Sequence, residues 1–171
     1  EEQRQRFLPG CVKGDTILAV AMTEPGIGSD LAGMTTSAVR DGDSYVINGS
    51  KTFITNGYLA DLVIVVAKTD PAGGARGTSL ILVEAGTPGF SKGRKLKKVG
   101  MKAQDTSELF FEDVRVPCSN LLGEEGQGSI NTLQVLDGGR IGIAALAVGL
   151  AQGAYEAALA YAKERRQFGQ A

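Results

Sequence analysis

The sequence has no histidine and no tryptophan, and only two of its 171 residues are cysteines. Without histidine, the chain itself excludes His-based zinc sites and nucleophilic catalysis by Ser-His or Cys-His pairs. Cys11 and Cys118 lie far apart and are too few for a disulfide framework or a Cys-rich metal centre. We therefore expect reduced thiols and no metal site.

An excess of basic residues is also missing. The chain has 18 Lys and Arg against 19 Asp and Glu, a formal net charge of −1, which argues against a nucleic-acid partner. No apolar run approaches the ~18 residues that a membrane span requires, and the opening EEQRQRFLPG is neither a signal peptide nor a transit peptide. With 43% hydrophobic residues, the chain can nevertheless fill a core.

Both ends have the pattern of an interrupted helix. The start is typical of the end of a polar helix stopped by Pro9-Gly10, and the final AYAKERRQFGQA leaves a helix directly after its last turn. We therefore expect this sequence to be a fragment of a longer protein.

The middle of the chain is rich in strand patterns. The Asn48-Gly49 pair predicts a hairpin turn, because both residue types tolerate positive φ. No helical pattern separates the candidate strands, which favours an antiparallel barrel or sandwich over βαβ units. The candidates are residues 16–22, 44–48, 50–55, 62–67, 78–84 and 107–116.

The end of the chain is helical. After Pro117, residues 128–135 give a short helical pattern and residues 140–168 a long one. The long pattern is apolar nearly all round and contains glycines that permit close approach of other backbones. It predicts a helix buried in a bundle or at an oligomer interface.

A glycine-rich segment, MTEPGIGSD at residues 22–30, directly follows the first predicted strand. Its glycines can expose backbone N–H groups, and Thr23 and Ser29 add hydroxyls, which suits a phosphate or the polar edge of a ring. It is neither a Walker loop nor a dinucleotide fingerprint, since Leu31 stands at the third glycine position. A glycine-rich turn without any ligand is the alternative.

Two further groups carry candidate chemistry. Strand alternation puts Phe53 and Thr55 on one face, where a flat ring can stack on the first and bond to the second, although ordinary strand packing explains the same pattern. Asp137 and Arg140 lie three residues apart on one helix face. They either form a local ion pair or contact an adenine or a phosphate. The basic residues between 92 and 102 predict a solvated surface.

Four segments occur in a distinctive order: MTEPGIGSD, NGSKTFITNG, DTSELFFEDVRVP with NLLGEEGQG, and LDGGRIGIAALAVGLAQGAYEAALAYAKERRQFG. Together they resemble the acyl-CoA dehydrogenase family, and LDGGRIGIA resembles its short-chain and related branches. The resemblance covers essentially the whole chain. It implies the end of an N-terminal helical domain at 1–14, a middle β-domain at 15–120 and the start of a C-terminal helical-bundle domain at 121–171. The expected fold is thus mainly β, an antiparallel barrel or sandwich flanked by helical segments, within an α+β multidomain protein.

The resemblance also implies a function, the FAD-dependent α,β-dehydrogenation of acyl-CoA thioesters in fatty acid metabolism. An electron-transfer flavoprotein would accept the electrons, and the protein would be a homo-oligomer, typically a tetramer, in a bacterial cytoplasm or a mitochondrial matrix. Ser29, Asp137 and Arg140 would contact the acyl-CoA substrate. The residues expected to contact FAD are Val20, Met22, Thr23, Gly28, Ser29, Phe53, Ile54 and Thr55, with Arg165, Gln167 and Phe168 contacting the FAD of a neighbouring subunit.

Two positions depart from the family pattern. Phe53 stands where relatives often have Trp. Gly139 stands where some branches carry the catalytic glutamate, so we expect the base beyond Ala171 and no catalytic residue within this chain. A non-catalytic flavin- or CoA-binding scaffold of the same fold and an acyl-CoA oxidase are the alternatives.

Overall fold

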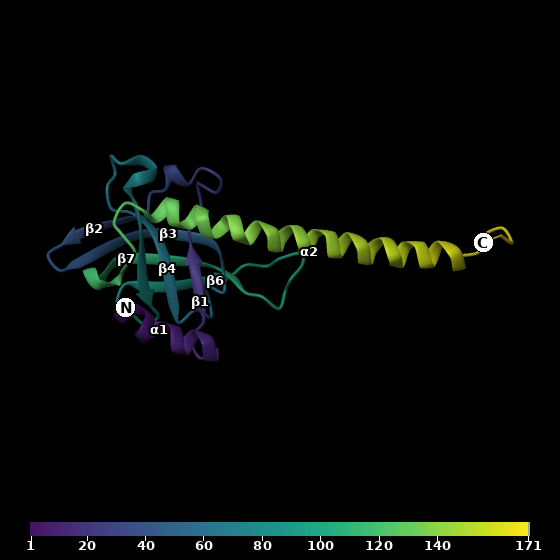
Figure 1. Ribbon diagram of the computed structural model, residues 1–171, viewed down its shortest axis with the longest axis horizontal. Helices are drawn as coiled ribbons and strands as arrows, with labels where there is room; N and C mark the ends of the chain where they lie inside the picture. The colour runs from purple at the N-terminus through teal and green to yellow at the C-terminus, as the bar shows by residue number, and fades with distance from the viewer. Residues whose placement is uncertain (171) are drawn as a thin grey trace. The chain divides into compact units, whose positions relative to one another are not determined.

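The first 130 residues of the chain form a β-sheet with a short helix beside it. The computed structural model describes residues 1–170, in two units, the first Glu1–Ile130 and the second from Asn131 onward. The sheet unit contains the helix α1 (Glu2–Lys13) and eight strands (Figure 1). The strands are β1 (Leu18–Ala21), β2 (Ser37–Asp41), β3 (Ser44–Thr55), β4 (Leu62–Lys68), β5 (Thr78–Glu84), β6 (Phe90–Lys95), β7 (Thr106–Pro117) and β8 (Leu121–Leu122).

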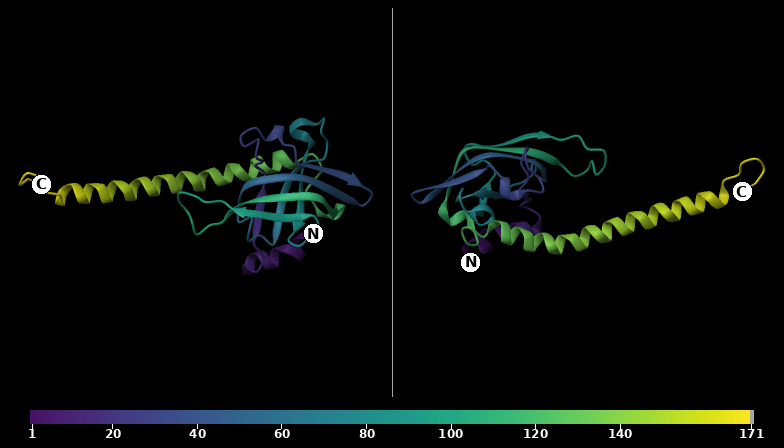
Figure 2. Two further views of the ribbon diagram at one scale, coloured as in Figure 1. Left: turned by 180° about the vertical axis from the view of Figure 1, so that it is seen from behind. Right: turned by 90° about the horizontal axis from the view of Figure 1, so that it is seen from above.

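The strands form one mixed sheet in the order β6-β7-β3-β2-β4-β5-β8, with β1 added beside β4. Most neighbours are antiparallel, but β1 and β2 each pair with β4 in parallel. The expectation of a mainly β fold flanked by helices is confirmed. The sheet was expected to be antiparallel, and the two parallel pairings differ from that expectation. Figure 2 shows the same strands from two further sides.

The core lies where strand patterns were strongest. β4 and β5 are buried almost along their whole length, as near-continuous Val, Ile and Leu runs predict. β7 alternates between buried and exposed positions, and its Phe111 stacks on Phe90 with ring centroids 5.1 Å apart. The buried strands β4 and β7 pair with β1 and β3, whose ends carry the candidate site.

The predicted hairpin at Asn48-Gly49 is wrong, because β3 runs straight through it. Asn48 exchanges two hydrogen bonds with Asp113 on β7, at 3.0 and 2.9 Å, and a β-bulge takes up the extra residue. Gly49 has φ 148°, and a Cβ there would lie 2.5 Å from the Thr36 hydroxyl. Gly49 therefore allows β3 to lie close to Thr36. The hairpin turn lies at Gly42 instead, between β2 and β3, where φ is 60°.

The first helix does not stop at Pro9-Gly10 as expected. α1 continues through Pro9 to Lys13 and ends at Gly14, whose left-handed φ of 82° closes the helix. Gly10 instead makes room for Thr16, whose hydroxyl lies 2.3 Å from the position that a Cβ would take. A proline costs one helical hydrogen bond but does not have to end the helix.

The second unit consists mainly of a long helix. The two helical patterns expected at 128–135 and 140–168 form one continuous helix, α2 (Gly128–Glu164), because the glycines at 138 and 139 weaken a helix without breaking it. By length and composition α2 could cross a membrane, a property that it shares with core helices of soluble proteins. Within its own chain the helix from residue 133 onward is exposed.

Candidate functional site

The loop after β1 is held in a tight turn. The backbone N–H groups of Glu24 and Ile27 each donate to the carbonyl of the other residue at 3.1 Å, which closes the chain around Pro25-Gly26. The carbonyl of Thr23 accepts a hydrogen bond from the Thr52 N–H of β3 at 2.8 Å. The loop is thereby attached to β3 directly at Thr23.

The end of β3 is irregular, and the irregularity exposes an aromatic ring. The register with β7 shifts between Lys51 and Ile54, and Phe53 adopts a positive φ of 58°. A bulge of this kind redirects side chains. Phe53 is 67% exposed although it sits in a strand whose neighbours Thr52 and Ile54 are buried. As expected, Phe53 and Thr55 are both on the exposed side.

These two segments line one hollow of about 370 Å³. Thr23 and Thr55, which were predicted to share a site, both line it, and Phe53 lines it too. Neither threonine hydroxyl makes a hydrogen bond to any residue that the structure describes. The hollow therefore offers free hydroxyls beside an exposed ring. Its lining consists of Leu18, Ala19, Val20, Met22, Thr23, Phe53, Ile54, Thr55 and Asn56.

A buried ion pair joins the same two segments. Lys51 Nζ donates to Glu24 Oε1 and to the carbonyl of Met22, each at 3.0 Å, and the side chains are 0% and 3% exposed. Glu24 also accepts hydrogen bonds from the backbone N–H of Thr35 (2.7 Å), the hydroxyl of Thr35 (2.7 Å) and the backbone N–H of Thr36 (2.9 Å). Its two carboxylate oxygens thus serve four donors.

This environment fixes the charge of both partners. Burial alone would raise the pKa of Glu24, but hydrogen bonds from Thr36 and Thr35 outweigh it and lower the pKa from 4.5 to about 2. Burial lowers the pKa of Lys51, and Glu24 opposes that shift. Neither residue was predicted as functional. The only sequence signal for them is that each lies within a motif that carries the family resemblance, Glu24 in MTEPGIGSD and Lys51 in NGSKTFITNG.

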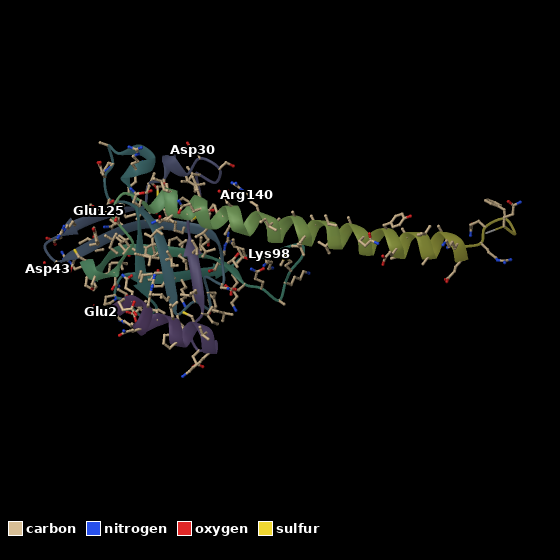
Figure 3. The ribbon with its side chains drawn as sticks, viewed as in Figure 1. Glu2, Asp30, Asp43, Lys98, Glu125 and Arg140 are labelled. Atoms are coloured by element: carbon tan, nitrogen blue, oxygen red, sulfur yellow. The ribbon has the colours of Figure 1, made fainter. Side chains whose placement is uncertain are left out.

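Several predicted residues do not line this hollow. Gly28 and Ser29 are exposed and directly precede Asp30, which is also exposed and which Figure 3 labels. In the second unit, Asp137 and Arg140 form an ion pair with each other on the exposed surface of α2.

The remaining predicted contacts lie at the end of α2. Arg165 donates to the Tyr161 hydroxyl at 2.7 Å, Gln167 pairs with Gln170, and Phe168 is fully exposed. Their roles stay predictions.

The basic stretch forms a hollow of its own. Lys95, Lys97, Lys98 and Lys102 line about 410 Å³ at the loop between β6 and β7, where Figure 3 labels Lys98. Lys98 Nζ donates to the carbonyl of Gln104 at 2.7 Å, so its ammonium group already has a hydrogen-bond acceptor within the loop. Among residues 1–170 no group of His, Cys, Asp or Glu could hold a metal ion.

Two family models match the chain. The model "Acyl-CoA dehydrogenase, middle domain" matches residues 19–114, and "Acyl-CoA dehydrogenase, C-terminal domain" matches residues 126–171. The first model includes the β1 and β3 segments that line the hollow.

Individual relatives agree with these matches. The chain is 54% identical to the mitochondrial long-chain specific acyl-CoA dehydrogenase of Sus scrofa, over 99% of this chain and 40% of that protein. It is 50% identical to the short-chain specific acyl-CoA dehydrogenase of Clostridium acetobutylicum, over 99% of this chain and 45% of that protein. Long-chain and short-chain relatives are thus similar to nearly the same degree.

A solved structure has the same fold. The crystal structure of an acyl-CoA dehydrogenase from Geobacillus kaustophilus superposes with a TM-score of 0.95 at 53% identity, over 99% of this chain and 45% of that chain. The chain therefore spans less than half the length of these relatives. From the two family models and these identities we conclude that the chain belongs to the acyl-CoA dehydrogenase family.

Proposed function

We propose that the full-length protein binds FAD with its ring system against the hollow between the β1 loop and the end of β3. One observation carries the proposal: Thr23 and Thr55 line a single hollow with hydroxyls that have no partner among the described residues, beside an exposed Phe53. An isoalloxazine ring has a flat apolar face and a polar edge of carbonyl oxygens and ring nitrogens. The donor set therefore fits the group.

Each lining residue has a role in this proposal. Phe53 covers the face of the ring, the backbone of Ile54, whose side chain is buried in the core, runs beside it, and Thr55 donates its hydroxyl near flavin N5. Thr23 and its neighbours Val20 and Met22 face the pyrimidine edge. We extend the site to Gly28 and Ser29, with Ser29 also approaching the CoA side, since an exposed loop is free to meet a ligand that lies partly outside this unit.

We further propose that the substrate is an acyl-CoA thioester and that the reaction is α,β-dehydrogenation, as part of fatty acid metabolism. When bound, FAD supplies the acceptor for the hydride from the β-carbon of the substrate. Asp137 and Arg140 meet the CoA moiety, and their exposed ion pair is available for this. Because Gly139 has no side chain, the glutamate that removes the α-proton lies outside these residues.

The end of α2 supports a homo-oligomer, which we propose to be a tetramer. At about 1.5 Å per residue, the 24 helical residues after Arg140 separate it from Arg165 by roughly 36 Å. A single ligand site does not span that distance along one helix. We therefore assign Arg165, Gln167 and Phe168 to the FAD of a neighbouring subunit. The apolar surface of α2 is then buried by other helices rather than by lipid.

We propose an electron-transfer flavoprotein as the electron acceptor. We also propose that the protein is soluble, in a bacterial cytoplasm or a mitochondrial matrix, because the relatives include mitochondrial and bacterial proteins.

The test is a flavin titration of the full-length protein. We expect a bound-flavin absorbance that bleaches when acyl-CoA thioesters of different chain length are added without oxygen, and no bleaching with the free acids. Bound flavin that no thioester bleaches would reject the dehydrogenase and favour a non-catalytic scaffold. Reoxidation by oxygen at the rate of turnover, without an electron-transfer flavoprotein, would instead indicate an acyl-CoA oxidase.

A further inference from the structure

The two walls of the hollow belong to different strands, so something must hold them at a fixed separation. Thr23 lies in the loop after β1, whereas Phe53 and Thr55 lie at the end of β3. Three consecutive loop residues are tied to two consecutive β3 residues. Lys51 Nζ bonds the carbonyl of Met22 and the carboxylate of Glu24, and the Thr52 N–H bonds the carbonyl of Thr23. Thr23 is thus held on both sides.

Glu24 extends the attachment to a third segment. Its carboxylate accepts hydrogen bonds from Thr35 and Thr36, which directly precede β2. Thr36 is fully buried and lies against Gly49 of β3. The carboxylate therefore joins the loop to β3 through Lys51 and to the approach of β2, so the loop cannot move relative to the sheet without breaking buried charged hydrogen bonds.

Stability alone does not explain such a pair. Removing two charges from water is costly, and replacing a buried ion pair with neutral side chains of similar volume is often neutral or stabilising. A neutral pair would fill the same space, but it would not hold the carbonyl of Met22 as an ammonium group does. What the charged pair adds to the Thr52–Thr23 backbone bond is the attachment of Met22 and Glu24, on both sides of Thr23, to β3.

We propose that Lys51 and Glu24 are positioning residues for the flavin site, which set the orientation of the Thr23 hydroxyl and neighbouring amides relative to Thr55 across the hollow. This inference rests on the proposed function, because the ligand in question is FAD. Lys51 and Glu24 are buried and are not among the lining residues, so they act through Met22, Thr23 and Thr52 rather than by touching the ring.

The decisive variant is the double substitution Lys51→Met with Glu24→Gln in the full-length protein. It removes both charges together, so neither side chain remains as an uncompensated buried ion. If the pair serves only the fold, the double variant has the same urea midpoint and the same FAD affinity as the wild type. If the pair positions the site, the double variant has the wild-type urea midpoint but binds FAD at least tenfold more weakly. The absorption band of the remaining bound flavin then also shifts.

Lys98→Met is the matched control, since Lys98 also bonds a backbone carbonyl but belongs to the loop between β6 and β7. It should bind FAD as the wild type does. FAD affinity within twofold of wild type in the double variant would overturn the inference. Should the double variant fail to fold, Lys51→Gln with Glu24→Gln, which also leaves no buried charge, replaces it. This variant should also lose tenfold in FAD affinity, and an unchanged affinity would overturn the inference equally.

The wild type separates this test from that of the proposed function. If the wild-type protein binds no FAD, the proposed function itself is refuted. If the wild type binds FAD and the variants bind it equally well, only the positioning role of Lys51 and Glu24 is refuted.

Discussion

The charge of Glu24 should make the stability of the sheet unit depend on pH below 4.5. Although burial alone raises the pKa of this carboxyl, hydrogen bonds from Thr36 and Thr35 lower it from 4.5 to about 2 in the folded protein. The unfolded chain then binds the proton more readily than the folded one. The stabilisation is therefore complete above pH 4.5 and is lost as the pH falls through about 2.

The magnitude follows from the two pKa values. One pKa unit corresponds to about 1.4 kcal/mol, so the difference between 4.5 and about 2 gives on the order of 3 kcal/mol at neutral pH. At pH 3 the carboxyl is still mostly ionised in the folded protein and almost wholly protonated in the unfolded chain, so roughly half of this contribution remains.

Urea unfolding of the full-length wild type and of Glu24→Gln, followed by circular dichroism at pH 7, 5, 4 and 3, measures this contribution. Glutamine does not titrate, so the variant lacks this particular pH dependence. The gap in unfolding free energy should stay nearly constant from pH 7 to 5 and shrink by roughly half by pH 3. Glu124→Gln removes one charge at an exposed position and controls for net charge. A gap between wild type and Glu24→Gln of the same size at pH 7 and pH 3 would refute the reasoning.

Three other substitutions test the fold and the site separately. Gly49→Ala should lower the free energy of unfolding by about 2–4 kcal/mol in urea, because its φ is positive and its Cβ would lie 2.5 Å from Thr36; a stability equal to wild type would contradict this packing. Phe111→Ala should cost about 3–5 kcal/mol in the same assay, since it opens a cavity against Phe90. Thr55→Val should leave the urea midpoint unchanged, because its hydroxyl has no partner among the described residues, and should weaken FAD binding about two- to tenfold through one lost hydrogen bond. Unchanged FAD affinity in Thr55→Val would remove Thr55 from the site.

The sequence was most informative where a single local rule decides the structure. The apolar run at residues 78–84 was predicted as a strand and forms β5 with the same ends. Such a run is buried on both faces whichever neighbour it pairs with. In contrast, β6 was not predicted, because FSKGRK carries charges and few apolar residues, and its pairing with β7 decides its structure.

Predictions failed where a distant contact overrides a local preference. Asn48-Gly49 has the composition of a hairpin turn, but Asp113, which is 65 residues away, bonds the Asn48 side chain and keeps the strand straight. The glycine is needed because Thr36 lies against it. Turn chemistry and close packing select the same residue type, so the sequence could not distinguish them.

The resemblance to the family placed Thr23 and Thr55 in one site, whereas each sequence pattern alone left a ligand-free alternative open. The structure brings both residues to one hollow, and their contact with a ligand stays a prediction. Lys51 could not be recognised in this way, because a lysine in a strand is normally solvated. Its burial depends on a carboxylate 27 residues earlier in the chain, and that carboxylate in turn depends on Thr35 and Thr36. A buried charge is tolerated only when several segments meet to neutralise it, so its presence marks a place where the relative position of those segments matters.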